Sequence, residues 1–329
     1  MINVKKIKLA AIALAIGSSL SFSTLVSAAT EIKVAFNQSD KHPQYIALED
    51  LGKKLSAETD GRYEVKVYPN ALLGDQRAAL ELLQNGAIQM AMVANPLAEN
   101  YDKSFRVIGL PYVYNGSSHQ ETVFTSGVLD ELFSSTEKFG FEVLTAYTAG
   151  ARSMYTKNGP VKNIADMKGQ KIRVMQSDTM IKILDCMGGT GVPMSQGEVY
   201  SAVQQGVLDG AENNEITYVD LKQYEVAPYF SATRHLMMPD LLAVSSDFIS
   251  SMSDEDQATL RRLAKESTPN QFKLWSDRIE TAKKTAQDKG ATFNEVDIKP
   301  FQQSCQKLQA ELLETPEQKA LFKKIVSMN

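Results

Sequence analysis

Two arginines lie in stretches where a charged side chain is unexpected, and both have the chemistry to bind an anion. Arg173 lies within GQKIRVMQSD, whose alternation predicts a strand with Arg173 on the same face as Met175 and apolar residues on either side. Arg152 lies in TAGARSMY, another small and apolar stretch. A guanidinium group is a rigid fork of donors that matches the two oxygens of a carboxylate. The two arginines either lie on exposed strand faces without function or form a pair of fixed cations directed into a cleft.

Other chemistries lack the residues that they need. The sequence has no GxSxG motif and no nucleophile paired with a histidine, so a hydrolase is a weaker interpretation. Its three histidines, His42, His119 and His235, have no partners at metal-ligand spacing. The formal net charge is −4, and no basic stretch typical of a nucleic-acid-binding or membrane-binding surface is present. We therefore expect no metal, no cofactor and no nucleic-acid partner.

The two cysteines leave two alternatives open. Cys186 and Cys305 are far apart in the sequence and show no CxxC spacing. In an oxidising compartment they can form one disulfide, and otherwise they are two buried free thiols.

The first 29 residues have the order of a secretory signal peptide. Three lysines within positions 5–8 precede an apolar run at positions 9–16, and small residues at positions 27–29 offer a cleavage site. The apolar run is too short and too rich in serine for a convincing membrane span, and a single uncleaved anchor is the lesser alternative. We therefore expect an exported, soluble mature protein.

The rest of the chain alternates strands and helices. Roughly 300 residues remain after the signal, enough for two lobes. The first elements are predicted as strand, helix, strand, helix and strand, at residues 31–36, 44–59, 63–68, 75–85 and 88–93. This β-α-β order predicts a mostly parallel sheet whose third strand leads to Asn95.

A second passage repeats this plan. A helix begins at a capping box of Ser195 and Glu198 and ends before Gly206, and a strand over residues 207–211 then leads to Asn213. Open α/β sheets bind ligands at the carboxyl ends of their strands. If the similarity is meaningful, each lobe contributes one polar loop to a shared ligand site.

The C-terminal part consists mainly of one long helical pattern. It begins at Ser253 and ends at Gly290, and Pro269 is the one break in it. A helix of this length exceeds the width of one lobe, so we expect it to lie across both. A coiled-coil surface is the rival interpretation, but the heptads are poor. A short strand over residues 292–296 and final helices complete the chain.

Three strings together resemble the extracytoplasmic solute-binding proteins of TRAP transporters. They are LLGDQRAALELLQNGAIQMAMV, TAGARSMYTKNGPVKNIADMKGQKIRVM and VPMSQGEVYSAVQQGVLDGAENN. The resemblance covers nearly the whole mature chain. It implies an α/β, two-lobed periplasmic binding protein fold of the type II-like class, with a long C-terminal helix that spans both lobes. We expect lobe I to comprise residues 30–149 plus 238–277, and lobe II to comprise residues 150–237 plus 278–329.

The resemblance also implies a role and partners. A protein of this family is not an enzyme; it captures an organic acid in the periplasm by closing over it, and delivers it to a permease of small and large membrane subunits. We expect a monomer. A ligand-binding partner of a chemoreceptor is the alternative role.

Three site residues follow from the resemblance. Arg173 matches the family's KxRV arginine, which typically forms a two-pronged salt bridge with the ligand carboxylate. Arg152 matches a second arginine, and Asn213 matches the asparagine of the E-N string that helps to hold the carboxylate.

The other candidate ligand contacts are mostly polar side chains at the predicted ends of elements. They are His42, Gln76, Arg77, Asn95, Met175, Glu215, Tyr218 and Asp240. Most of these groups can bond the hydroxyls of a polyol, whereas the set is poor in the extra aromatic residues that a cation cage requires. We therefore favour a sugar acid, either a hexuronate such as glucuronate or galacturonate or a ketogulonate, over a C4-dicarboxylate or a zwitterion such as ectoine.

Overall fold

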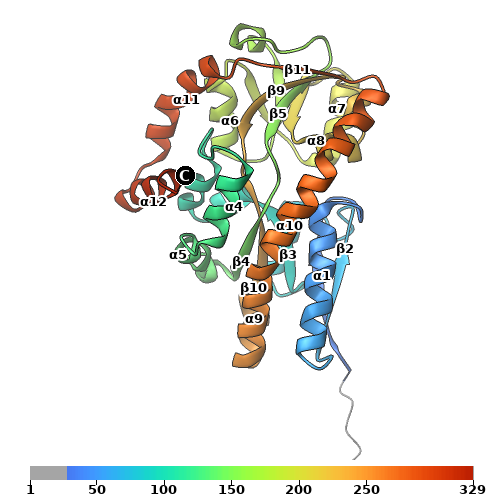
Figure 1. Ribbon diagram of the computed structural model, residues 1–329, viewed down its shortest axis with the longest axis vertical. Helices are drawn as coiled ribbons and strands as arrows, with labels where there is room; N and C mark the ends of the chain where they lie inside the picture. Colours follow the sequence, from blue (N-terminus) through green and yellow to red (C-terminus); the bar gives the residue numbers. More distant parts are fainter. Residues whose placement is uncertain (1–27, 329) are drawn as a thin grey trace, which may run out of the picture.

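Two mixed β-sheets, each covered by helices, form the two lobes of the protein (Figure 1). The computed structural model describes residues 28–328. The two-lobed α/β fold expected from the sequence is confirmed. The predicted signal peptide lies almost entirely outside the described residues.

Lobe I is built on a sheet with the strand order β2-β1-β3-β10-β4. Strands β1, β2 and β3 are parallel, whereas β10 runs antiparallel between β3 and β4. The strands and the helices that follow them in sequence are β1 Thr30–Ala35, α1 Pro43–Glu58, β2 Tyr63–Tyr68, α2 Gln76–Gln84, β3 Met90–Ala94, α3 Asn95–Glu99, the 3-10 helix η1 Lys103–Gly109, α4 Ser117–Thr125, α5 Asp130–Ser134, β4 Phe141–Thr148, β10 Pro239–Ser245 and α9 Ser246–Ser251.

Lobe II is built on a sheet with the strand order β11-β9-β5-β8-β6-β7. Its elements are β5 Arg152–Thr156, β6 Lys171–Val174, α6 Asp178–Cys186, β7 Thr190–Pro193, the 3-10 helix η4 Gln196–Glu198, α7 Val199–Gln204, β8 Gly210–Asn213, α8 Glu215–Asp220, β9 Tyr229–Leu236 and β11 Thr292–Glu295. Strand β5 runs antiparallel to both of its neighbours, β8 and β9.

The predicted mostly parallel arrangement is wrong for the strands that follow the crossings between lobes. Strands β5 and β10 each begin at the side of their sheet that faces the other lobe. Strands β8 and β3 end at that side, so β5 runs antiparallel to β8 and β10 runs antiparallel to β3. The strand predicted over residues 207–211 is also displaced, because β8 begins only at Gly210. Val207 suggested an earlier start, but it lies in a turn and is 55% exposed. The capping box of Ser195 and Glu198 is confirmed.

One crossing between the lobes, from β4 to β5, requires a glycine. Gly150 has a φ of +64°, and a Cβ atom added there would lie 2.7 Å from Nε1 of Trp275. Any other residue would combine backbone strain with a collision. Trp275 belongs to the long C-terminal helix, so that helix packs directly on the crossing.

Helix α10, Asp254–Asp288, confirms the expected helix across both lobes. Its 35 residues correspond to a length of about 52 Å. Pro269 lies inside the helix without ending it. The helix contacts α1 and β4 in lobe I and α8 and β11 in lobe II, as its diagonal course in Figure 1 shows.

Polar side chains join α10 to the end of β4, next to the crossing. Gln271 accepts a hydrogen bond from the Thr148 backbone N–H at 2.8 Å and donates one to the Thr148 carbonyl at 3.0 Å. The hydroxyls of Ser267 and Tyr147 lie 2.6 Å apart. The helix therefore supports the strand from which the chain leaves lobe I.

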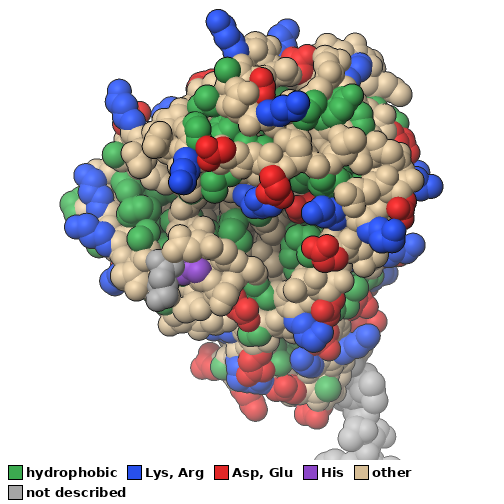
Figure 2. All heavy atoms as spheres, turned by 45° about the horizontal axis from the view of Figure 1, so that its top comes forward, with side chains coloured by type: hydrophobic (Ala, Val, Ile, Leu, Met, Phe, Trp, Pro, Cys, Tyr) green, Lys and Arg blue, Asp and Glu red, His purple; other side chains and the backbone are tan. Residues whose placement is uncertain are grey.

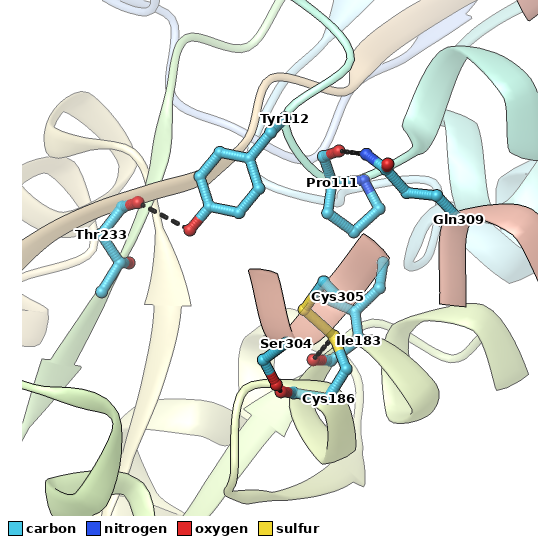
Figure 3. Close-up of a disulfide and its surroundings, with 8 residues drawn as sticks. All are labelled: Pro111, Tyr112, Ile183, Cys186, Thr233, Ser304, Cys305 and Gln309. Atoms are coloured by element: carbon cyan, nitrogen blue, oxygen red, sulfur yellow. Dashed lines mark hydrogen bonds between the residues drawn. A yellow bond between two sulfur atoms is a disulfide. The ribbon is translucent and has the colours of Figure 1, made fainter. Parts of the chain in front are cut away.

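The C-terminal helices α11, Lys299–Leu312, and α12, Pro316–Val326, contact both lobes. Helix α11 is joined to α6 by a disulfide between Cys186 and Cys305, and the Ser304 hydroxyl donates to the Cys186 carbonyl (Figure 3). Helix α12 instead packs on η1, and the Ile325 carbonyl lies 2.9 Å from Nε2 of His119. Of the two alternatives for the cysteines, the structure has the disulfide.

The surface carries charges of both signs. Figure 2 shows positive and negative side chains interspersed over one face of the molecule. In the described part of the chain, every helix is too short or too polar to cross a membrane.

We predict that reduction of the disulfide destabilises the protein. The bond closes a loop of 119 residues, and its loss should lower the free energy of unfolding by about 2–4 kcal/mol. Denaturant unfolding with and without reductant measures this difference, and a Cys186→Ser, Cys305→Ser double variant should not respond to reductant. Two titratable thiols in the unfolded, unreduced protein would contradict the bond.

Candidate functional site

A cavity between the lobes brings together side chains from both sheets. Its inner chamber, of about 20 Å³, opens beside an outer chamber of about 230 Å³, and the two share four lining residues, Gln76, Arg173, Met175 and Gln196. The other residues of the inner chamber are Gln38, His42, Ala94, Ala149, Arg152, Asn213, Asn214, Thr217 and Asp240. Strands β3, β6 and β8 end at this cavity, and β5 and β10 begin there. Arg173 therefore stands where the two chambers meet.

Arg173 is a buried cation without a carboxylate partner among the described residues. Its neighbours in β6, Ile172 and Val174, are fully buried, and Arg173 itself is only 4% exposed. Its Nε donates to the Met194 carbonyl at 2.8 Å, and both terminal nitrogens lack a partner in the described part of the chain. Burial lowers the pKa of Arg173 to about 10, so the side chain remains charged at neutral pH. The interpretation of Arg173 as an exposed strand residue is wrong.

Arg152 is also buried, but its charge is compensated. Its Nε lies 2.5 Å from Oε2 of Glu212, and its Nη2 donates to Oε1 and to the backbone carbonyl of Glu212, both at 2.8 Å. Burial alone would raise the pKa of Glu212, but the charge of Arg152 and the hydrogen bonds from His235 and Arg152 together lower it to about 2. His235 lies 3.5 Å from Glu212, and burial lowers the pKa of His235, which favours the neutral ring. We expected two cations without partners. Instead, Arg152 forms an ion pair with Glu212, and Arg173 alone has no carboxylate partner among the described residues.

Asn213 connects Arg152 to the cavity. Its Oδ1 accepts hydrogen bonds from Nη1 of Arg152 at 2.9 Å and from the Asn214 backbone at 2.9 Å. Its amide NH2 group has no partner among the described residues, and one of the two Nη1 hydrogens of Arg152 is likewise unused. Both donors are available to an acceptor in the inner chamber.

The first turn of α1 holds two polar groups on the lobe I side. His42 caps the helix, because its Nδ1 accepts from the Gln44 backbone N–H at 3.4 Å. Burial lowers the pKa of His42 to about 3, so the ring is neutral and carries its hydrogen on Nε2. Asp240 accepts a hydrogen bond from the Gln44 side chain at 2.9 Å.

Gln76 is also fixed by the backbone. Its Oε1 accepts from the Ala94 N–H at 3.0 Å, which leaves its NH2 group for the cavity. It is the first residue of α2, after the capping residue Asp75.

Side chains from both lobes also bond across the cavity. Gln196 of η4 accepts from Asn37 at 3.0 Å and from Gln38 at 3.4 Å. The lobes are thus in contact at this point. Sequence reasoning did not single out Asn37, Gln38 or Gln196; the one available signal was the capping box next to Gln196.

Four predicted contacts lie outside the inner chamber. Arg77 lines the outer chamber and is exposed. Asn95 is buried and donates to the Phe105 carbonyl at 3.0 Å. Tyr218 lies in the core of lobe II, where its hydroxyl donates to the Ala227 carbonyl at 2.8 Å. Glu215 is the first residue of α8 and lines neither chamber.

The positions of Tyr218 and Glu215 correct the prediction. Asn213 ends β8, and the chain then turns at Asn214 into α8, which directs Tyr218 into the core. Glu215 and Tyr218 are close to Asn213 in the sequence, but they do not line the cavity. Met175, His42, Gln76 and Asp240 do line it.

In the described part of the chain, no three His, Cys, Asp or Glu side chains are arranged to hold a metal ion. The cavity is instead lined by donors around Arg173 and by mixed polar groups on the opposite lobe. Such an arrangement can bind an anion that also carries hydroxyl groups.

Comparisons with known proteins agree with this fold. Residues 34–315 match the family model of bacterial extracellular solute-binding proteins, family 7. A solute-binding protein of Chromohalobacter salexigens is 34% identical over 258 residues, which cover 78% of this chain and 77% of the relative.

Two solved structures of TRAP periplasmic solute-binding proteins are also similar. One, from Bradyrhizobium sp. BTAi1 in complex with galacturonate, has a TM-score of 0.89 and 32% identity, and the match covers 91% of this chain and 100% of that one. The other, from Anaerococcus prevotii with bound glucuronate, has a TM-score of 0.88 and 34% identity, over 91% of this chain and 98% of that one. The chain belongs to family 7 of the bacterial extracellular solute-binding proteins, the TRAP transporter family that its motifs resemble.

Proposed function

We propose that this protein binds a hexuronate, with glucuronate and galacturonate as the first candidates, and holds its carboxylate on Arg173. The observation that carries the proposal is the buried guanidinium of Arg173, which has one backbone acceptor and no carboxylate partner in the described part of the chain. A buried charge without a partner is unfavourable, and an anionic ligand relieves that cost.

The geometry of Arg173 favours a two-pronged contact. Because Nε is held by the Met194 carbonyl, the guanidinium plane is fixed before the ligand arrives. Its two terminal nitrogens can then donate to both oxygens of one carboxylate. The unused donors of Asn213 and Arg152 lie on the same side of the cavity and supply further hydrogen bonds.

The rest of the ligand faces the lobe I side of the cavity. His42 and Gln76 offer donors there, and Asp240 offers an acceptor. A sugar ring with several hydroxyls can use all of these groups. The hexuronates bound to the two similar solved structures have this combination of one carboxylate and several hydroxyls.

The biological setting follows from the family. The chain is exported by a signal peptide of residues 1–29, works as a periplasmic monomer without a cofactor, and passes its ligand to the small and large membrane subunits of a TRAP permease. Lobe I comprises residues 30–149 plus 238–277, and lobe II comprises residues 150–237 plus 278–329. The contact between α12 and η1 lies across this division.

Ligand binding should close the two lobes about the crossings near Gly150 and Met238. The Gln196 contacts with Asn37 and Gln38 require the closed arrangement, because their partners lie on opposite lobes. X-ray scattering should therefore show a smaller radius of gyration with saturating hexuronate than without it. An unchanged radius at proven saturation would contradict hinge closure.

Replacement of Arg173 should weaken binding strongly without preventing folding. Truncating one member of a buried charge pair costs roughly 2–5 kcal/mol, so Arg173→Ala should raise the Kd by about thirtyfold to several thousandfold. Arg173→Lys should fall between this variant and the parent, because it keeps the charge and loses the fork. Calorimetry with D-glucuronate and D-galacturonate measures both effects.

A matched neutral sugar provides the control for this experiment. D-glucose and D-galactose lack the carboxylate, so the parent and Arg173→Ala should bind them equally poorly. If Arg173→Ala binds the hexuronate within about threefold of the parent, the role of Arg173 is refuted. If the folded parent binds no hexuronate, the proposed ligand class is refuted.

A further inference from the structure

We propose that Asp240 makes this site selective for acids with a single carboxylate, because it places a fixed carboxylate opposite Arg173 where a second ligand carboxylate would have to lie. The inference rests on the proposed binding of a sugar acid through Arg173 and adds a determinant of specificity to it.

The charges of the inner chamber are divided between the two lobes. Lobe II contributes Arg173, which is unpaired, and Arg152, which is neutralised by Glu212. Lobe I contributes Asp240 as the one ionisable carboxyl group in the chamber lining, together with neutral His42. A ligand that bridges the lobes therefore has its anionic end beside lobe II and its other end beside Asp240.

Asp240 is held rigidly in this position. It lies near the start of β10, where it pairs with Ala94 of β3 and Tyr147 of β4. Gln44 donates to its Oδ2 at 2.9 Å and to the Thr148 carbonyl at 3.1 Å, so the amide is fixed at two points. The second carboxyl oxygen, Oδ1, has no partner among the described residues. Asp240 is partly exposed and lines the chamber, which leaves Oδ1 available to the ligand.

A hydroxyl group suits this oxygen and a second carboxylate does not. An ionised Asp240 accepts hydrogen bonds and cannot donate them, so it binds a hydroxyl of the ligand directly. Burial outweighs the Gln44 hydrogen bond and the charge of Arg152, so the pKa of Asp240 is raised above its usual value. A ligand carboxylate beside Oδ1 of Asp240 would therefore meet a like charge, or either Asp240 or the ligand carboxylate would have to take up a proton.

The charge balance of the site leads to the same conclusion. With Asp240 ionised, the charges of Arg152, Glu212, Arg173 and Asp240 sum to zero. A monocarboxylate leaves one net negative charge in the closed cavity, and a dicarboxylate leaves two. Arg77 is the remaining cation in the outer chamber, but it is exposed and water screens it.

The test uses two acyclic acids that differ at one end only. D-gluconate ends in a hydroxymethyl group where D-glucarate has a second carboxylate, and D-glucuronate reports on the proposed function. Calorimetry at neutral pH should show that the full-length parent binds D-glucarate at least about tenfold more weakly than D-gluconate. Asp240→Asn should bind D-glucarate at least about tenfold more tightly than the parent does, while its affinity for D-gluconate should fall or stay the same.

Two further variants complete the design. Asp240→Ser removes the charge with a smaller group, so it repeats the test if the asparagine amide disturbs Gln44. Glu215→Gln is the matched control, because Glu215 is a mostly buried carboxyl whose pKa is also raised by burial, yet it lines neither chamber. It should leave the affinities for all three acids within about threefold of the parent values. Thermal unfolding verifies that each variant is folded.

The outcomes separate the two proposals. The inference is overturned if the parent binds D-glucarate as tightly as D-gluconate, or if neither Asp240 variant improves D-glucarate binding by more than about threefold. A loss of D-glucarate binding in Arg77→Ala would also overturn it, by showing that the second carboxylate lies in the outer chamber. If the folded parent does not bind D-glucuronate, the proposed function is refuted. Even then, tighter D-glucarate binding in the Asp240 variants would support the charge at Asp240 as a determinant of ligand specificity.

Discussion

A buried guanidinium group that has no carboxylate partner in the described part of the chain is the constraint around which the cavity is arranged. Arg173 can keep this position because Ile172 and Val174, on either side of it, are fully buried and fix the strand. The Met194 carbonyl compensates only part of its charge. Beside it, Arg152 is paired with Glu212, which prevents two buried cations without partners from facing each other. Among the described residues of the inner chamber, one arginine without a carboxylate partner, Arg173, therefore remains.

The bonds that support the lobes differ in kind from those that cross the cavity. Gln271 makes two hydrogen bonds to the backbone of Thr148, and both residues are buried. The contacts of Gln196 with Asn37 and Gln38, at 3.0 and 3.4 Å, are only partly buried. A neutral hydrogen bond adds only about 1 kcal/mol to stability, so these contacts alone hold the lobes together weakly.

The sequence contained more information about the fold than about the details of the site. Local patterns predicted the first strands, the long helix and the capping box at Ser195, because these depend on periodicity and on nearby residues. The pairing of Arg152 with Glu212 was missed because it depends on the antiparallel register of β5 and β8, which joins residues 60 positions apart. Gln38 was missed because it lies in an irregular segment, and Gln196 because it lies in a 3-10 helix too short to show a periodic pattern. Tyr218 was predicted wrongly since its environment is decided by the turn at Asn214.

The first turn of α1 shows how backbone structure determines what the cavity can recognise. The Gln44 N–H donates to Nδ1 of His42, which leaves a hydrogen on Nε2 and makes His42 a donor toward the cavity. The Gln44 side chain holds Asp240, which remains an acceptor when ionised. A hydroxyl can accept from one of these groups and donate to the other. A carboxylate cannot donate and an ammonium group cannot accept, so the donor and the acceptor that Gln44 fixes together match a hydroxyl group better than either ion.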